Sequence, residues 1–347
     1  MRGLFTKLHT MKRSVFFKLA PLALAGLIGG TVLSCTPVKR GEYASGSATI
    51  FCDDGFRNIL EEEIQVFEYT YPQSSILPFY VSEQEAIDTL LADATQAVII
   101  TREFTPEEIK FMKAKYKRIV KQDPIAVDAV ALIINKDNPV NSLSMDDIKQ
   151  IMNGEIKKWS QLAVNDTSDI KIVFDHAGSS TVSYLREKFL PEGKTISEVA
   201  NAYGQQNNAQ VFDVVKTDPS ALGVISVSWL GDDLSNAKNI PVNIRYEQYN
   251  NENDTVATNL TTEVKILKVS NPTEDNDYSS VAYAPYQAYI YSGEYPLVRK
   301  VYFVSSASGS TVMNSFFVFV RGFVGQKIIS RTGILPYKMN PRVIQVI

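Results

Sequence analysis

The amino-acid sequence predicts an α/β fold in which strands and helices alternate along the chain. Short apolar segments rich in β-branched residues, such as 48–52 and 96–102, are each followed by a segment with helical spacing. Alternation of this kind is typical of a parallel sheet covered by helices. With 347 residues, 45% of them hydrophobic, the chain is long enough to bury one large core or two ordinary ones.

The N-terminal part of the predicted fold contains three strand–helix pairs. The expected strands are 48–52, 74–81 and 96–102, and the helices that follow them are 56–67, 82–93 and 105–116. Ser82 and Glu85 have the spacing of a capping box, which predicts a helix start at Ser82. Pro106 suits the first turn of the third helix, because that turn does not need its N–H group.

The middle of the chain continues the alternation around one unusually long strand. The β-rich stretch 123–140 is expected to cross between two lobes. The segments after it read as a helix over 144–162 with a stop at Gly154, a strand, turn and helix over 170–190, and a helix, turn and strand over 209–230.

The C-terminal third is less regular. Residues 232–280 are polar and rich in Asn and Asp. Sparse β signals in that region lie at 240–246 and 263–269. A strand is then expected over 295–306, followed by a long helix over 308–338 that breaks near Gly333 and leads into an extended tail.

The first 35 residues have the pattern of a secretory signal. They carry five Lys or Arg and no acid, and an apolar run over 19–33 is followed by Ser34 and Cys35. A Cys after small and aliphatic residues resembles the lipobox of bacterial lipoproteins, which implies that Cys35 is acylated. Simple secretion and an uncleaved anchor are the alternatives, although the run is shorter than the roughly 20 apolar residues that span a bilayer. Residues 36–45 read as a polar tether, and Met11 is an alternative start to Met1.

Charge and cysteine content exclude several classes of function. The chain has 35 Lys and Arg against 38 Asp and Glu, and the basic signal makes the remainder still more acidic, so nucleic-acid binding is not expected. If Cys35 carries lipid, Cys52 has no partner for a disulfide and is expected to be a buried small residue. His176 is the one histidine outside the signal, so no metal cluster and no cofactor is expected.

The stretch 172–185 predicts an anion site. An apolar strand, 172–174, leads through a turn with Gly178 into a helix that begins at Ser179-Ser180-Thr181. Free N–H groups at a helix start, flanked by hydroxyls, bind anions. Asp175 stands at the mouth of this turn, where a carboxylate would repel an anion.

Five segments occur in an order that resembles a known family. They are 100–108, 128–140 with 144–159, 178–185, 221–230, and 295–336. In this order they resemble the substrate-binding proteins of bacterial phosphate ABC transporters, in a divergent lipoprotein form of the Bacteroidetes type. The resemblance covers nearly all of residues 46–340.

The family implies an α/β periplasmic binding protein fold of the type II-like kind. Two α/β lobes are then joined by a hinge of crossing strands, and the ligand is held in the cleft. The implied organisation is a signal peptide over 1–35, a tether over 36–45, a first lobe from 46–124 plus 270–347, and a second lobe over 125–269.

The family's site can be carried over onto this sequence in part. Ser179 and Thr181 match the second-lobe motif, whereas Ser180 replaces its inner Gly and Asp175 stands where an Arg is expected. In the first lobe, acids occupy the loops 52–55 and 81–85, and Gln96 replaces an Asp. The expected ligand-binding residues are Asp53, Asp54, Ser82, Glu83, Arg102, Asp128, Asp175, Gly178, Ser179, Ser180 and Thr181.

Several of these residues admit more than one role. Asp175 either turns away and caps a backbone N–H, or accepts the proton of a monoprotonated phosphate, or marks a site whose ligand is no longer phosphate. Arg102 either contacts the ligand or forms a structural ion pair with Glu103 or Asp128. Asp128 is a cleft acid or a structural one, because buried acids usually have partners.

The resulting functional hypothesis is a non-enzymatic binding protein. It is expected to be monomeric, lipid-anchored at the periplasmic face of the cell envelope, and to capture an oxyanion, inorganic phosphate first, for the permease of an ABC importer. The alternative is a binding module with an altered ligand that acts as a sensor or surface protein. A hydrolase is the third reading, and it is disfavoured because its Ser–His–Asp arrangement would have to use His176, three residues from Ser179.

Overall fold

The computed structural model describes residues 45–162, 165–231, 239–253, 259–271, 281–309 and 311–338. These residues belong to one compact unit, Lys39–Ile347. The expected signal peptide, the lipidation of Cys35, the choice between Met1 and Met11 and nearly all of the tether lie outside the described residues.

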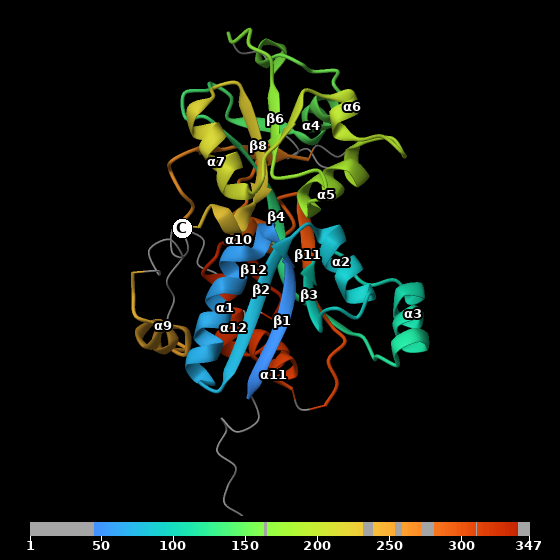
Figure 1. Cartoon of the computed structure of the whole chain (residues 1–347). Coiled ribbons are helices and arrows are strands. Elements are labelled where there is room, and N and C mark those ends of the chain that lie inside the picture. Colours follow the sequence, from blue (N-terminus) through green and yellow to red (C-terminus); the bar gives the residue numbers. More distant parts are fainter. Residues whose placement is uncertain are drawn as a thin grey trace, which may run out of the picture. The chain divides into compact units, whose positions relative to one another are not determined.

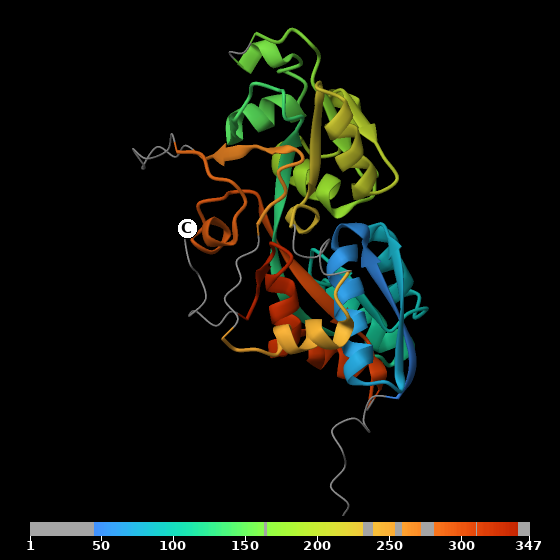
Figure 2. The ribbon, with the colours of Figure 1, turned by 90° about the vertical axis from the view of Figure 1, so that its left-hand side faces the viewer.

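The described residues form two α/β lobes whose sheets share one strand (Figures 1 and 2). The strand order is β2-β1-β3-β11-β4-β8-β6-β7, with β12 and β9 also paired to β4. The strands on this path are β1 (Gly46–Asp53), β2 (Ser74–Val81), β3 (Ala97–Ile100), β4 (Lys121–Ile134), β6 (Lys171–Phe174), β7 (Ala202–Gly204), β8 (Ala221–Ser226) and β11 (Val298–Ser305). The shorter strands are β5 (Ser142–Ser144), β9 (Lys265–Ile266), β10 (Lys268–Ser270) and β12 (Leu335–Pro336).

Strand β4 is the crossing strand that the long β-rich stretch predicted. Its first half pairs with β11, from Lys121 opposite Ser305 to Ala129 opposite Val298. Its second half pairs with β8, and Figure 1 shows β4 passing from one lobe into the other. Residues 129–134 are fully buried and apolar, because both faces of the strand are covered there.

Helices cover the two sheets in the order expected from the alternation. In the first lobe these are α1 (Arg57–Thr70), α2 (Glu83–Leu91), α3 (Pro106–Tyr116), α11 (Val312–Val320) and α12 (Phe323–Ser330). In the second lobe they are α4 (Met145–Met152), α5 (Ser180–Phe189), α6 (Ile196–Val199) and α7 (Asn208–Thr217), and α9 (Val242–Tyr249) and α10 (Gln287–Tyr291) follow later in the chain. The capping box expected at the start of α2 is formed in part, since the Ser82 hydroxyl accepts the Glu85 N–H.

The β signal at 240–246 was wrong, because this segment lies largely in helix α9. Helix α9 packs against α1 and α12, and its buried residues are Arg245 and Tyr249, four positions apart. That spacing places both side chains on one helical face, where Arg245 forms a buried ion pair with Glu62 of α1. Because the charged Arg245 belongs to this buried face, the sequence pattern did not predict a helix there.

The expected single helix over 308–338 is two helices, and its break lies at Gly322 rather than near Gly333. A Cβ on Gly325 would lie 2.6 Å from the Val320 Cα, so the start of α12 approaches the end of α11 closely. Gly333 has φ of +85° and serves the turn before β12. Among the described residues no single helix is long and apolar enough to span a membrane; α11 and α12 reach that length and apolarity together, with a bend of 59° between them.

The α/β fold with two lobes and a crossing strand confirms the predicted fold class. The lobe boundaries at 124, 125, 269 and 270 remain a prediction. Helix α9 falls inside the range expected for the second lobe but contacts α1 and α12 of the first.

Candidate functional site

Five buried carboxylates gather where β1, β2 and β6 end, beside the middle of the crossing strand β4, and together we call them the acidic cluster. Its members are Asp53, Asp54, Glu83, Asp128 and Asp175. Asp53 ends β1, Glu83 begins the helix after β2, and Asp175 follows β6. The carboxyl ends of parallel strands meet at one edge of a sheet, and ligands of α/β proteins bind at such edges.

The loop after β1 contacts the starts of two helices of the second lobe. One Asp53 carboxylate oxygen accepts the Gly55 N–H at 2.9 Å, and the other accepts the Ser180 N–H of α5 at 3.1 Å. Asp54 accepts the Asn208 N–H of α7 at 3.4 Å and pairs with Arg57. The two adjacent acids therefore occupy donors at helix N-termini.

The start of α5 has the geometry that the sequence predicted. The Ser179 hydroxyl caps the helix by accepting the Val182 N–H, and it lies 2.9 Å from the Thr181 hydroxyl. Gly178 leaves room for close approach, because a Cβ there would lie 3.2 Å from the Ser82 Cβ at the start of α2. Hydroxyls from both lobes therefore lie near one another at this point.

Asp175 does not cap a backbone N–H in any described contact. Its oxygens accept the Thr181 hydroxyl at 3.1 Å and the Asn208 side-chain amide at 3.2 Å. The carboxylate is 1% exposed, so it is turned into the cluster and not toward solvent. The backbone-capping role expected for Asp175 is not seen among the described contacts, and its other two expected roles remain predictions.

Asp128 lies on β4 and is held by two partners. Ser226 at the end of β8 donates to one of its oxygens at 2.8 Å, and Arg299 on β11 donates to the other through Nε at 3.0 Å. A second guanidinium nitrogen, Nη2, lies 2.9 Å from the same Asp128 oxygen. Arg299 thus supplies a buried counter-charge beside the cluster.

Glu83 and Arg102 are each engaged by a local partner. Glu83 accepts both the N–H and the hydroxyl of Thr101, the hydroxyl at 2.7 Å. Arg102 forms a two-pronged pair with Glu108 of α3, at 2.9 and 2.7 Å. Arg102 therefore forms a structural ion pair, but the expected partners Glu103 and Asp128 were wrong. Its partner is Glu108, in the first turn of α3.

Burial and mutual repulsion change how these acids titrate. Burial, followed by the charges of Asp175 and Glu83, raises the pKa of Asp53 to about 7, against smaller lowering effects of Arg299 and the Ser180 N–H. Burial also raises the pKa of Asp128, although Arg299 and Ser226 oppose this. The raised pKa makes Asp53 the member of the cluster that is expected to gain and lose its proton around neutral pH.

No group of three or more acids, Cys or His in the described residues has the arrangement of a metal site. Cys52, next to Asp53, is a fully buried free thiol, as expected, and burial raises its pKa well above the usual range. Among the described residues, Arg299 supplies the positive charge that faces Asp53 and Asp128.

Four polar atoms at the site have no hydrogen-bond partner among the described residues. They are Arg299 Nη1 and Nη2, Ser180 Oγ and Asn208 Oδ1, and each belongs to a residue less than one tenth exposed; Nη2 still lies within ion-pair distance of Asp128. A buried polar atom without a partner is costly, so such atoms indicate a place for a polar ligand or water.

Arg299, Asn208 and Ser226 were missed from the sequence. Arg299 gave one signal that could have found it, since it interrupts the apolar strand 295–306 at a position that faces inward. Asn208 follows an N-cap, Asn207, and so resembles an ordinary helix start. Its role depends on Asp54 and Asp175, which are distant in sequence.

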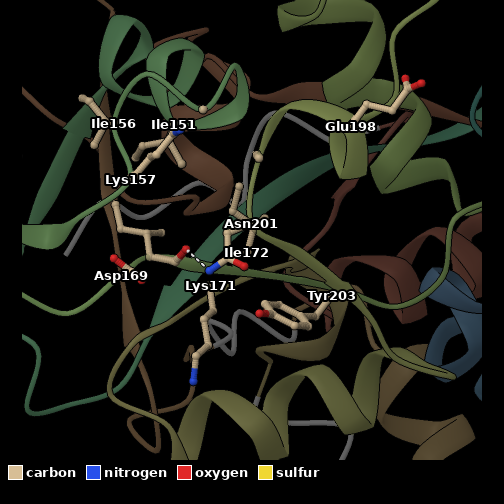
Figure 3. A pocket seen from close by; sticks show the side chains of 12 residues that line it. Ile151, Ile156, Lys157, Asp169, Lys171, Ile172, Glu198, Asn201 and Tyr203 are labelled. Atoms are coloured by element: carbon tan, nitrogen blue, oxygen red, sulfur yellow. Dashed lines mark hydrogen bonds between the residues drawn. The ribbon is translucent and has the colours of Figure 1, made fainter.

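Two open cavities lie in the second lobe, and neither is lined by a member of the acidic cluster. The larger, about 440 Å³, is shown in Figure 3 with Lys157, Asp169, Lys171 and Tyr203 around it. The smaller, about 160 Å³, is lined mainly by apolar residues near β7. The buried acidic cluster is thus distinct from these two cavities.

Comparison with known proteins places this geometry in a family. The chain matches the PBP superfamily domain over residues 38–321. It is 20% identical to the phosphate-binding protein PstS of Pseudomonas aeruginosa over 234 residues, which are 64% of this chain and 72% of that protein. It is 26% identical to PstS of Bacillus subtilis over 202 residues, which are 58% of this chain and 64% of that protein.

Solved structures confirm the fold. A phosphate ABC transporter substrate-binding protein from Clostridium perfringens, solved with bound phosphate, has a TM-score of 0.63 at 21% identity and covers 84% of this chain and 100% of its own. An ABC-type phosphate transport receptor from Vibrio cholerae has a TM-score of 0.58 at 18% identity, with 83% and 99% covered. The resemblance predicted from the five segments is confirmed by these relatives.

Proposed function

Because the chain belongs to the PBP superfamily, we propose that it is a non-enzymatic binding protein that captures an oxyanion, inorganic phosphate first, for an ABC importer. The named relatives are phosphate-binding proteins, which supports this ligand class. The observation that carries the proposal is the convergence of helix starts, hydroxyls and Arg299 at one buried place between the ends of β1, β6 and β8.

The chemistry of this place suits an oxyanion. Helix α5 and helix α7 each have ten residues and direct their first N–H groups at the cluster, so their dipoles favour negative charge there. In the part of the chain that the structure describes, nothing accepts a hydrogen bond from Ser180 Oγ or Arg299 Nη1. The nearby carboxylates select a ligand that brings a proton, since an anion without one would be repelled.

Isothermal titration calorimetry of the full chain in detergent tests the proposal. Phosphate is titrated at pH 6 and pH 8, with sulfate as the control ligand. We expect micromolar or tighter phosphate binding and no heat with sulfate. Absence of phosphate binding at both pH values would refute the phosphate assignment.

A pair of variants tests the site. Arg299→Gln removes the buried guanidinium charge, and Arg102→Gln removes a guanidinium that is paired with Glu108 outside the cluster. We expect at least about a tenfold loss of phosphate affinity in the first, as for a charge-assisted hydrogen bond, and little change in the second. Equal effects of the two would place the ligand elsewhere.

The cellular setting belongs to the same proposal. The lipobox-like sequence before Cys35 supports a lipid anchor at the periplasmic face of the envelope, and the likeness to substrate-binding proteins of phosphate transporters supports delivery to a permease; the monomeric state is part of the proposal. Membrane fractionation with mass spectrometry tests the anchor: Cys35→Ser should release the chain from the membrane and remove the lipid mass.

A second function is favoured by one specific observation. The anion-binding helix starts are occupied by Asp53 and Asp54, which suits a binding module with an altered ligand that acts as a sensor or surface protein. Phosphate uptake in a strain lacking this chain separates the two functions. Unchanged uptake, together with no phosphate binding in vitro, would favour the module with an altered ligand.

A further inference from the structure

The carboxylate of Asp53 lies where an oxyanion at the start of α5 would lie. Its Oδ2 accepts the Ser180 N–H, the first N–H of α5, at 3.1 Å. Asp54 accepts the first N–H of α7 in the same way. Two neighbouring acids of the first lobe thus take the donors that helix starts of the second lobe offer to anions.

Independent contacts hold the same loop against the second lobe. The Gly55 carbonyl accepts hydrogen bonds from the Ser228 hydroxyl at 2.8 Å and from the Trp229 indole at 3.1 Å. The loop 53–55 is therefore fixed by four donors from the second lobe: Ser180 N–H, Asn208 N–H, Ser228 Oγ and Trp229 Nε1. A ligand that arrives at the start of α5 finds the Ser180 N–H already donating to Asp53.

Other buried polar atoms beside Asp53 still lack hydrogen-bond partners in the described part of the chain. Ser180 Oγ, Arg299 Nη1 and Asn208 Oδ1 are buried beside Asp53 and lack partners among the described residues. A carboxylate has two acceptor oxygens, and both oxygens of Asp53 are already used, by Gly55 and Ser180. An oxyanion with more oxygens would accept hydrogen bonds from Ser180 Oγ and Arg299 Nη1, and a proton carried by the ligand would serve the Asn208 amide oxygen, which only accepts.

We propose that Asp53 is an internal competitor for the ligand: its carboxylate holds the oxyanion position at the start of α5, and the ligand binds after this carboxylate has left the Ser180 N–H. This inference rests on the proposed function. It assigns Asp53 a role opposite to that of a direct ligand contact, because removing the carboxylate should strengthen binding.

Electrostatics sets the size of the competition. A unit negative charge about 4 Å from an oxyanion weakens binding on the order of a thousandfold at an effective dielectric of about 20. The charged groups that face Asp53 are Asp175 after β6, Glu83 on α2 and Arg299 on β11, with Asp54 beside it on its own loop. The three acids outnumber the one arginine, so their negative charges favour the protonated form of Asp53.

The competition should therefore depend on pH. When Asp53 is protonated, it repels an anion less and accepts the Ser180 N–H less strongly. Its pKa of about 7 places this change near neutral pH, so phosphate affinity of the native chain should fall between pH 6 and pH 8. A variant without the carboxylate should show a smaller fall.

Calorimetry with inorganic phosphate at pH 6 and pH 8 tests the inference on the full chain. Asp53→Ser removes the carboxylate and leaves a hydroxyl, and Asp137→Ser makes the same change at an exposed position. We expect Asp53→Ser to bind phosphate at least about tenfold more tightly than the native chain at pH 8, and Asp137→Ser to bind as the native chain does.

The outcomes separate this inference from the proposed function. Tighter binding by Asp53→Ser, or binding by this variant alone, supports both. Unchanged or weaker binding by Asp53→Ser overturns the competitor role and leaves the phosphate function standing. If no form of the chain binds phosphate, both fail. Asp53→Asn, which keeps the shape of the side chain, gives the same comparison should Asp53→Ser not fold, as judged by circular dichroism.

Discussion

Replacing Arg299 with Met should destabilise the fold strongly, because it leaves a buried carboxylate without its counter-charge. Asp128 is 0% exposed, and Arg299 provides its ion pair at 2.9 Å. The Ser226 hydroxyl would be its remaining side-chain partner in the described structure. Removing one member of a buried pair costs about 3–5 kcal/mol of unfolding free energy.

The loss should also depend on pH, and its sign follows from Asp128. Burial already raises the pKa of this carboxyl group, and without Arg299 it rises further. A folded-state pKa above the unfolded value means that the stability contribution is present at low pH and is lost as pH rises through the folded pKa. Arg299→Met should therefore cost less at pH 5 than at pH 8.

Urea denaturation followed by tryptophan fluorescence measures these free energies. Lys300→Met, at the exposed neighbouring position on β11, is the matched control and should change stability by no more than about 0.5 kcal/mol. The double variant Asp128→Asn with Arg299→Met should recover part of the loss, because the unpaired charge is gone. A cost below about 1 kcal/mol for Arg299→Met, equal at both pH values, would refute this reasoning.

Three further predictions concern other parts of the molecule. Asp53 has a folded-state pKa of about 7 against an ordinary value of 3.8, so the contribution of Asp53 to stability is lost as pH rises from 3.8 to about 7. Asp53→Asn should therefore be more stable than the native chain at pH 8, by about 4 kcal/mol at most. Thermal melts at pH 4 should show no difference between the two chains. Gly223→Ala should cost about 1–3 kcal/mol in urea denaturation, because its Cβ would lie 2.6 Å from a Val215 methyl group; no loss would mean that the core yields there. Arg102→Ala should cost less than about 1 kcal/mol, since the pair with Glu108 is partly exposed to solvent, with side chains 38% and 19% exposed, and a larger loss would assign Arg102 a role beyond this pair.

The parts of the site that are local in sequence could be predicted, and the parts built from distant segments could not. Ser179 and Thr181 follow one strand and begin one helix, so a single short segment of sequence determines that their hydroxyls lie close together. Arg299 reaches Asp128 across 171 positions of sequence. The sequence pattern led us to expect that a counter-charge was lost at Asp175, whereas β11 brings Arg299 into the site.

The fold shows the same division. Strands of four or more apolar residues and capped helices were predicted with small errors at their ends, because propensity and burial agree there. Helix α9 was missed because its buried face is formed by Arg245 and Tyr249, and their burial depends on Glu62 of α1. A charge buried by a distant partner has no local signature.

The position of β11 between β3 and β4 has a consequence for the synthesis of the chain. The strands β4, β6, β7 and β8 of the second lobe are complete once residue 226 has been made. The first lobe must wait for residues 298–305, and until then β3 presents an unpaired edge. An open edge that waits for a late strand pairs slowly and is prone to aggregation, so we expect the first lobe to be the more aggregation-prone half of the chain until β11 pairs.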